Sequence, residues 1–261
     1  MFESPRGYIS NLKLRINNYK LDKVAVVTGG IRRLGRYITY FLADEGYNLA
    51  LIYNSSSKEE LSKTSNNLRM RNIKFKFYKC DIRELSQLKK TVDKIDVDFN
   101  KIDLLINNAG TIQKVEFKNI SQKLFDDTIN LNLRAALFTA NYGIRVLEKA
   151  DKPSIINIAS LGGMQNWTNY FPYSISKTAV IKLTYLLAKK LAPRIRVNAI
   201  APGTIIIEDE EKGTPEKTLL ERIPLKRYGK PSDIIEAIRF FINDEYVTGQ
   251  IIAVDGGRTL N

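Results

Sequence analysis

Short runs of Val, Ile and Leu alternate with longer stretches of mixed polar and apolar residues along this chain. Such runs are typical of strands buried on both faces of a parallel sheet, and the stretches between them have helical periodicity. The predicted strands are Lys23–Thr28, Asn48–Tyr53, Lys74–Lys79, Leu104–Ile106, Ser154–Ser160, Arg196–Ala201 and Ile251–Val254. The principal helices predicted between them cover Leu85–Phe99, Gln122–Lys149, the region from Tyr173 to about Leu191, and Ser232–Asn243.

This alternation predicts an α/β fold: a single Rossmann-like, doubly wound parallel sheet with helices on both faces. Residues 1–20 precede the first strand and are expected to form an N-terminal extension, while residues 21–261 are expected to form one domain. Ser57 and Glu60 are spaced as a capping box, which predicts the start of a helix after the second strand. The polar segment Glu208–Lys217 is expected to be a surface excursion.

Composition narrows the class of protein. The 261 residues include 41 Lys and Arg against 28 Asp and Glu, but the basic residues are spread along the chain, so no nucleic-acid partner is predicted. No apolar run is long enough to cross a membrane, and no secretory signal is evident. The single cysteine, Cys80, fits a cytoplasmic protein. The chain has no histidine, which excludes His-ligated metal sites and Ser-His nucleophiles, and no metal is expected.

A glycine-bearing turn joins the first strand to the first helix. Its glycines, Gly29 and Gly35, lie on either side of Arg32, Arg33 and Leu34. Glycines in such a turn let the backbone approach a pyrophosphate, and the N-terminus of the helix supplies unpaired N–H groups. The turn is therefore a candidate dinucleotide site.

The end of the second strand indicates which dinucleotide is bound. Sheets that bind NAD place an Asp or Glu there, about 20 residues after the turn, to hold the ribose 2′-hydroxyl. Here that corner contains no acid and consists of Asn54, Ser55 and Ser56, while Arg32 and Arg33 add positive charge. Because these groups suit a 2′-phosphate, the sequence predicts NADP(H) rather than NAD(H).

Tyr173 and Lys177 provide the candidate chemistry. Residues four apart lie on one face of a helix, one turn from each other. A free phenol has a pKa of about 10, and a nearby ammonium favours its ionised form. The pair is therefore a candidate proton donor to a carbonyl or acceptor from an alcohol.

These motifs, together with several others, resemble the short-chain dehydrogenase/reductase family over about Lys23–Gly257. The further motifs that carry the resemblance are Asp81, Asn107–Gly110, Asn132, Ser160, Arg196–Gly203 and Thr248–Gly257. The gap of 13 residues between Ser160 and Tyr173 is usual in that family.

The resemblance implies a role for each residue. Tyr173 would donate or accept the proton, Lys177 would lower its pKa and hold the nicotinamide ribose, Ser160 would bind the substrate carbonyl, and Asn132 would hold a water. Asp81 would contact the adenine end. The other cofactor contacts implied are Gly29, Arg32, Arg33, Leu34, Ile82, Asn108, Ala109, Gly110, Pro202, Gly203 and Ile205. The domain would thus be a dinucleotide-binding catalytic domain.

The resemblance leaves the substrate open between two classes. The glycine turn, with Arg32 and Arg33, resembles that of pteridine reductases. Those enzymes typically carry aspartate where this chain has Ser160. The C-terminal segment resembles 3-oxoacyl-carrier-protein reductases, and Arg194 falls where those enzymes present an arginine to the acidic carrier. Their companion basic position is Asp151 here, although Lys149 and Lys152 flank it. A 3-oxoacyl thioester, small or carrier-bound, is the leading prediction and a pterin the alternative, in a homotetramer.

Two segments are expected to shape the substrate site. Thr204–Ile207 would cover it, and its walls would be Met164, Gln165, Trp167 and Phe171. A nucleotide-binding sensor without turnover is an alternative of another class. The set of Asn132, Ser160, Tyr173 and Lys177 favours an enzyme, because a binding module has no need of all four.

Overall fold

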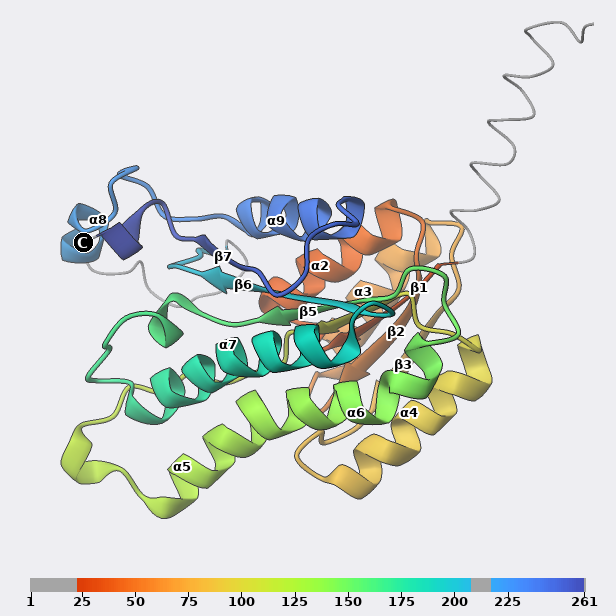
Figure 1. Cartoon of the computed structure of the whole chain (residues 1–261), viewed down its shortest axis with the longest axis horizontal. Coiled ribbons are helices and arrows are strands. Elements are labelled where there is room, and N and C mark those ends of the chain that lie inside the picture. Colours follow the sequence, from red (N-terminus) through yellow and green to blue (C-terminus); the bar gives the residue numbers. More distant parts are fainter. Residues whose placement is uncertain (1–22, 208–216, 261) are drawn as a thin grey trace, which may run out of the picture.

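The computed structural model describes residues 23–207 and 217–260, so the predicted extension 1–20 and nearly all of the predicted excursion lie outside the described residues. Within them, parallel strands form one sheet in the order β3-β2-β1-β4-β5-β6-β7. Helices cover both faces of this sheet (Figure 1). The predicted Rossmann-like α/β fold is therefore confirmed.

The strands agree closely with the predicted apolar runs. They are β1 (Val24–Thr28), β2 (Asn48–Tyr53), β3 (Phe75–Lys79), β4 (Leu104–Asn107), β5 (Ser154–Ile158), β6 (Arg196–Pro202) and β7 (Ile251–Val254). The largest difference is at β5, which ends at Ile158 rather than at Ser160. Ser160 instead begins a turn that leads away from the sheet.

The helices also follow the prediction, with one interruption. They are α2 (Arg33–Asp44), α3 (Lys58–Arg69), α4 (Leu85–Phe99), α5 (Gln122–Ile129), α6 (Ala135–Leu147), α7 (Phe171–Leu191), α8 (Lys217–Glu221) and α9 (Pro231–Asn243). The capping box at Ser57 and Glu60 opens α3 as predicted. The long helical region predicted over about Gln122–Lys149 is confirmed, and a π-helical turn within it, Asn130–Arg134, separates α5 from α6.

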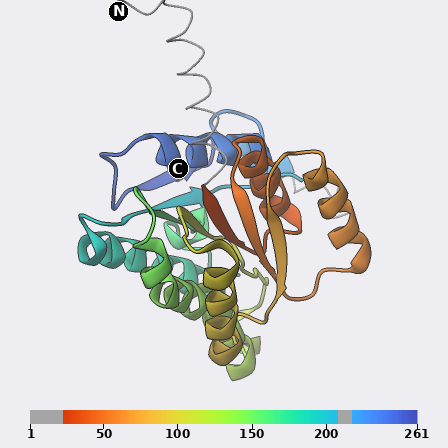
Figure 2. The same ribbon diagram turned by 90° about the vertical axis from the view of Figure 1, so that its right-hand side faces the viewer.

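Successive residues of the strands enter two separate apolar cores. In β1, Ala25 and Val27 pack with residues of α2 and α9, whereas Val26 packs with residues of α4 and α6. Figures 1 and 2 show α2 and α9 above the sheet and α4, α6 and α7 below it. Burial on both faces explains why the strands have nearly continuous apolar sequences.

The order of the strands reverses beside β1, because the chain passes outward to β2 and β3 and then returns to β4. Ligands of open α/β sheets bind at such a point, beyond the carboxyl ends of the strands. Gly29 follows β1 here, and Asn108 follows β4. The topology therefore places these two residues next to each other at the expected binding crevice.

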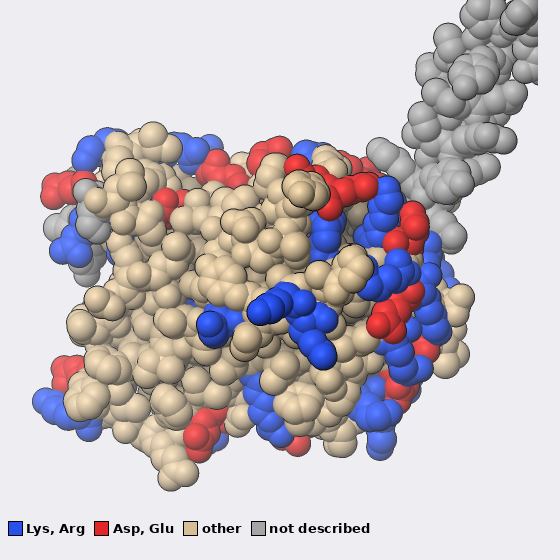
Figure 3. Space-filling view, in the orientation of Figure 1, with Lys and Arg blue, Asp and Glu red and all other residues tan. Residues whose placement is uncertain are grey.

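Charged side chains are unevenly distributed over the face shown in Figure 3. Lys, Arg, Asp and Glu are intermixed toward its right-hand side, and much of its left-hand and central surface is uncharged. Some of the basic residues are paired, as in the contacts of Asp96 with Arg145 (2.8 Å) and Lys149 (2.6 Å). Across the described ranges, no helix combines the length and apolar character needed to span a membrane.

Candidate active site

A cavity of about 1160 Å³ lies at the carboxyl ends of the strands and reaches from the end of β2 to α7. Every predicted cofactor residue lines it, and so does Ser160. Of the predicted catalytic residues, only Asn132 does not line the cavity. The fold thus brings together groups that are more than 100 residues apart in the chain.

The glycine turn is held against the end of β4 by hydrogen bonds. The Asn108 side-chain amide donates to the carbonyl oxygens of Thr28 (3.0 Å) and Gly29 (3.1 Å). The Thr28 hydroxyl accepts hydrogen bonds from the backbone N–H groups of Asn108 and Ala109, both at 3.0 Å. These bonds fix the turn around Gly29, whose φ of +66° is in the left-handed region.

Gly35 allows α2 to begin close to this turn. A Cβ at Gly35 would lie 2.0 Å from the carbonyl oxygen of Gly29. We expect Gly35→Ala to push the helix N-terminus away from the turn, lowering the melting temperature and weakening NADPH binding at least about tenfold. Calorimetry and fluorescence titration of NADPH measure both effects.

Gly143 of α6 provides the matched control for that substitution. A Cβ there would meet Leu147 at 3.8 Å, an ordinary contact. We expect Gly143→Ala to leave NADPH affinity unchanged and to stabilise the helix by about 0.5–1 kcal/mol. Equal behaviour of the two variants would contradict a special role for the Gly35 position.

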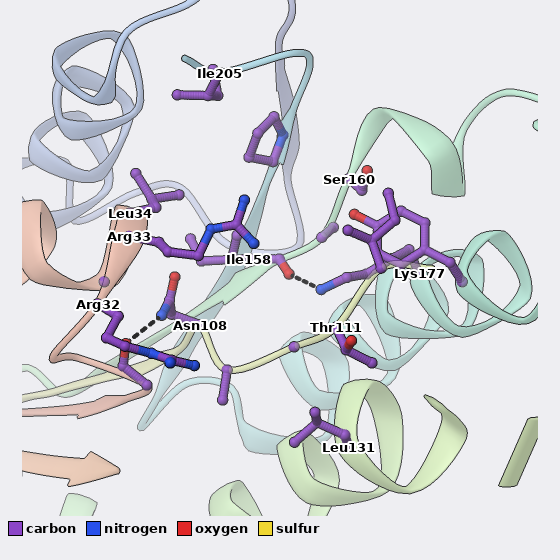
Figure 4. A pocket seen from close by; sticks show the side chains of 18 of the residues that line it. Arg32, Arg33, Leu34, Asn108, Thr111, Leu131, Ile158, Ser160, Lys177 and Ile205 are labelled. Carbon is purple, nitrogen blue, oxygen red and sulfur yellow. Dashed lines mark hydrogen bonds between the residues drawn. The ribbon is translucent and has the colours of Figure 1, made fainter. Parts of the chain in front are cut away.

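The two arginines of the turn point in different directions. Arg33 has a φ of +51°, in the left-handed region where a glycine is common. In Figure 4 its side chain extends across the cavity toward Ile158 and Lys177, whereas Arg32 lies beside Asn108. Arg32 is exposed, and its Nε lies 3.9 Å from a carboxylate oxygen of Glu60. Positive charge thus reaches both the corner after β2 and the end of the cavity beside Lys177.

Asp81, predicted at the adenine end, is held by a residue that the sequence did not single out. The Arg83 guanidinium contacts its carboxylate at 2.7 Å, and the Arg83 backbone N–H donates to it at 3.0 Å. Arg83 therefore keeps the pKa of Asp81 below its ordinary value, so the carboxylate stays ionised. Both residues line the cavity. The spacing of two residues carries no recognised motif.

Ser160 and Tyr173 meet at the other end of the cavity. The Ser160 hydroxyl oxygen accepts a hydrogen bond from the Gly162 backbone N–H at 3.0 Å, which fixes its position. Burial raises the pKa of the Tyr173 phenol, while the hydrogen bond with Ser160 and the positive charge of Arg33 act in the opposite direction. The phenol is therefore protonated at neutral pH, as a proton donor must be.

Lys177 lies beneath Tyr173 and is almost completely buried, with 5% of its surface exposed. Its Nζ donates a hydrogen bond to the carbonyl oxygen of Ile158 at 2.7 Å and lies 5.9 Å from the centroid of the Tyr173 ring. Burial lowers the pKa of Lys177 to about 8. Gly110 packs closely beside this site, because a Cβ there would lie 3.1 Å from the Asn132 side-chain oxygen and 3.5 Å from Nζ.

Asn132 lies in the π-helical turn and supports the cavity wall from behind. Its side-chain oxygen accepts a hydrogen bond from the Thr111 backbone N–H (2.8 Å), and its amide donates to the Thr111 carbonyl (3.0 Å) and to the Ser176 hydroxyl (2.9 Å). π-Helical turns are rare and occur frequently at functional sites. Through Asn132, this turn connects Thr111, which follows β4, with Ser176 of α7. Ser176 directly precedes Lys177 in the chain.

Comparisons with known proteins agree with this geometry. A family profile described as enoyl-(acyl carrier protein) reductase matches residues 30–259. A 3-oxoacyl-[acyl-carrier-protein] reductase of Thermotoga maritima is 36% identical over 241 residues, covering 90% of this chain and 97% of the relative. The chain belongs to the short-chain dehydrogenase/reductase family. Its members are oxidoreductases that bind a nicotinamide cofactor.

Two further proteins illustrate the range of similarity. The 2-dehydro-3-deoxy-D-gluconate 5-dehydrogenase of Dickeya dadantii is 33% identical over 251 residues, covering 93% of this chain and 98% of the relative. A blue fluorescent protein from a metagenomic library, solved in complex with NADPH, has a TM-score of 0.85 and 29% identity, covering 90% of this chain and 97% of that one.

The walls of the substrate end in this family member differ from the prediction. Trp167 lines the cavity as expected, but Met164, Gln165 and Phe171 do not. Met164 is exposed, and the ring of Phe171 packs against that of Phe117 with centroids 5.1 Å apart. Helical and turn geometry point these side chains away, which sequence proximity to Ser160 could not show.

The segment predicted to cover the substrate end lines the cavity in part. Other residues that the sequence did not indicate line the cavity as well. Of Thr204–Ile207, the residues Thr204, Ile205 and Ile207 line the cavity, and the acidic residues that follow lie outside the described residues. Cavity-lining residues absent from the prediction include Thr111, Arg222 and Arg258. Thr111 could have been included because it directly follows Gly110.

Arg194 and its neighbours, considered for carrier docking, are engaged within the chain. The Arg194 guanidinium donates to the carbonyl oxygens of Glu148, Ala150 and Asp151, just beyond the end of α6. The flanking lysines are also paired, Lys149 with Asp96 at 2.6 Å and Lys152 with Glu245 at 2.7 Å. In this family member, Arg194 stabilises a helix C-terminus, as cations there commonly do.

Proposed function

We propose that this protein is an NADPH-dependent reductase of a carbonyl compound, with a 3-oxoacyl thioester as the leading substrate class. One observation carries the proposal: Ser160, Tyr173 and Lys177 meet at one end of a cavity whose other end is the glycine turn. A dinucleotide that spans this cavity would place its nicotinamide beside the three side chains.

The residues present fit such a cofactor. Gly29, Gly35 and Gly110 line the cavity and present only their backbone to it. Arg32 and the corner of Asn54, Ser55 and Ser56 would hold the adenosine phosphate, whereas Arg33, which was also predicted there, extends toward Ile158 and Lys177. Asp81 and Ile82 would lie at the adenine. Asn108, Ala109, Leu34, Pro202, Gly203 and Ile205 would line the remainder. When bound, NADPH supplies a hydride to the carbonyl carbon.

Three side chains would then complete the reduction. The Ser160 hydroxyl donates a hydrogen bond to the carbonyl oxygen and orients it. The Tyr173 hydroxyl donates its proton to that oxygen as negative charge develops on it, which yields the alcohol. The Lys177 ammonium stabilises the resulting phenolate and holds the nicotinamide ribose. Asn132 keeps Thr111 and Ser176 in place around Lys177.

The preference for NADPH rests on the charge around the glycine turn. Arg32 lines the cavity together with Ser55 and Ser56, and no acid follows β2. We expect Arg32→Ala to weaken NADPH binding about 10- to 100-fold, because a charge-assisted hydrogen bond to the 2′-phosphate is lost, and to change NADH binding little. Equilibrium titration of both nucleotides tests this.

Arg36 is the matched control for the nucleotide preference. It lies one turn further along α2 and does not line the cavity. We expect Arg36→Ala to leave the ratio of NADPH to NADH affinities unchanged. If Arg32→Ala weakens NADH binding as much as NADPH binding, the arginine acts on the turn as a whole and the argument from the 2′-phosphate fails.

The substrate class is supported by the similarity to the Thermotoga reductase, and the arginine-bearing turn favours a pterin as the second candidate. The deciding assay follows NADPH oxidation with an acetoacetyl thioester and with dihydrobiopterin in parallel, with NADH as the control cofactor. Thioester turnover supports the leading proposal. Pterin turnover alone would replace it, and tight NADPH binding without turnover of either would favour the sensor alternative.

We also propose a homotetramer, as the family resemblance implies. Apolar side chains remain exposed on the surface helices, among them Leu137 of α6, Leu186 of α7 and Phe240 of α9, with 37%, 57% and 45% of their surface accessible. Exposed apolar groups of this kind mark protein interfaces when they form a patch. Sedimentation velocity measures the state directly, and a monomer would contradict the proposal.

A further inference from the structure

The C-terminal segment folds back over the substrate end of the cavity. Gly256 and Gly257 follow β7 with φ of +67° and +87°, which turns the chain sharply. The two carboxylate oxygens of Asp255 accept hydrogen bonds from the backbone N–H groups of Gly257 (2.9 Å) and Thr259 (2.7 Å). This turn places Arg258 in the cavity wall.

The Arg258 side chain is held by three segments of the chain. Its guanidinium carbon lies 4.9 Å from the centroid of the Trp167 ring, and one of its N–H groups donates to the Thr204 hydroxyl at 3.2 Å. Gln165 joins the segments, because its amide donates to the Arg258 carbonyl (2.9 Å) and its oxygen accepts from the Trp167 indole (3.2 Å). Arg258 is therefore positioned rather than freely extended into solvent.

Trp167 in turn lies directly against the catalytic turn. A Cβ at Gly162 would be 2.8 Å from its ring, and the Gly162 backbone N–H donates to Ser160. Arg258 thus lies one aromatic ring away from the residues that would bind the reacting carbonyl. From this position, the Arg258 guanidinium would contact a group of a small substrate other than the reacting carbonyl.

The charge of Arg258 is not matched by an acid within the described part of the chain. No carboxylate there lies within 4.0 Å of it, and the nearby Asp255 uses both oxygens for the C-terminal turn. Other arginines are paired, as Arg145 is with Asp96. Arg222 also lines the cavity. Burial and the positive charge of Arg222 lower the pKa of Arg258, but a guanidinium stays cationic at neutral pH.

We propose that Arg258, stacked on Trp167, binds an anionic group of the carbonyl substrate, either a carboxylate or a phosphate. A planar guanidinium that meets no carboxylate among the described residues is a side chain well suited to such groups. The inference rests on the proposed reductase function and narrows its substrate class. A carboxylate would make the substrate an oxo acid, whereas a phosphate would belong to the pantetheine arm of a thioester.

Two matched pairs of substrates distinguish these sources. Acetoacetate and ethyl acetoacetate differ in the carboxylate, and acetoacetyl-coenzyme A and acetoacetyl-N-acetylcysteamine differ in the phosphates. We expect Arg258→Gln to lower kcat/KM about 10- to 100-fold for the anionic member of one pair. The kcat/KM for the neutral member of that pair and the affinity for NADPH should change less than threefold. The affected pair identifies the anion.

Fluorescence provides a readout that does not depend on turnover. Trp167 is the only tryptophan of the chain, so its emission reports on this site alone. We expect the anionic member of one pair to change the emission of the wild-type protein bound to NADP⁺, and Arg258→Gln to abolish the change while Arg258→Lys retains part of it. Arg239→Gln is the control, because Arg239 also stacks on a ring, that of Phe41, away from the cavity.

The outcomes separate the two proposals. Turnover of all four compounds with equal losses in Arg258→Gln would overturn the anion site and leave the reductase intact. An emission change that requires Arg258, without turnover of any compound, would support the anion site and contradict carbonyl reduction of these substrates. No emission response to either anionic compound, together with no selective kinetic loss, overturns the inference.

Discussion

Replacing Tyr173 by Phe is expected to lower kcat about 10²- to 10⁴-fold while changing NADPH affinity less than threefold. The substitution removes only the hydroxyl that would donate the proton, and general acids contribute rate factors of that size. The ring stays between Ser160 and Lys177, so the cavity retains its shape. Steady-state kinetics and nucleotide titration on the same preparation measure both quantities.

Tyr185 provides the control for this substitution. It lies on the same helix, α7, with 46% of its surface exposed, and it does not line the cavity. Tyr185→Phe is expected to keep full activity. A Tyr173→Phe variant that retains most of its activity would show that another group supplies the proton, and the proposed reaction would then lose its central residue.

Replacing Lys177 by Met is expected to change activity and stability in opposite directions. Activity should fall about 10²-fold or more, because the ammonium beside the phenol is lost. At pH 7 the variant should nevertheless be more stable than the wild type by about 1–2 kcal/mol, since a charged group buried in the wild type is removed. The lost hydrogen bond to the Ile158 carbonyl offsets part of that gain.

The pH dependence of this difference has a defined sign. The pKa of Lys177 is lowered to about 8 in the folded protein, whereas an unfolded lysine has a pKa of about 10.4. Between these values the unfolded state binds more protons, so this residue makes the wild-type free energy of unfolding rise with pH. The advantage of Lys177→Met should therefore be greatest below pH 8 and decline toward pH 10.4.

Denaturant unfolding at several pH values measures this difference. Lys182→Met is the control, because Lys182 is exposed on the same helix and its removal should give a small effect that does not depend on pH over this range. A Lys177→Met variant that is less stable than the wild type at pH 7, with no trend toward high pH, would show that the ammonium is not penalised by burial.

Much of the fold follows from local patterns in the sequence. The strands that carry the site, β1, β4, β5 and β6, are buried on both faces, so their apolar runs are nearly continuous and easily recognised. The glycine turn was predictable because Gly29 requires a left-handed φ and Gly35 excludes any side chain. These constraints act within a few residues and therefore appear in the sequence itself.

Other features depend on contacts and side-chain orientations that no local sequence pattern indicates. The π-helical turn at Asn132 is joined to Thr111, and no local pattern distinguishes it from the helices on either side. Arg83 binds Asp81 through side-chain orientation rather than through a motif. The walls of the substrate end depend on which way each side chain after Ser160 points, and only Trp167 of those predicted faces the cavity.

The sequence by itself determined the sheet, the nucleotide turn and the residues proposed for catalysis, because local backbone chemistry and periodic burial specify them. Only the tertiary structure decided what surrounds them: the burial of Lys177, the orientation of Arg33 toward the catalytic end, and the return of Arg258 to Trp167. The physical reason is that burial and cavity walls depend on which side chains the fold brings together, and some of these are far apart in the chain, as are Gln165 and Arg258, which share a hydrogen bond across 93 residues.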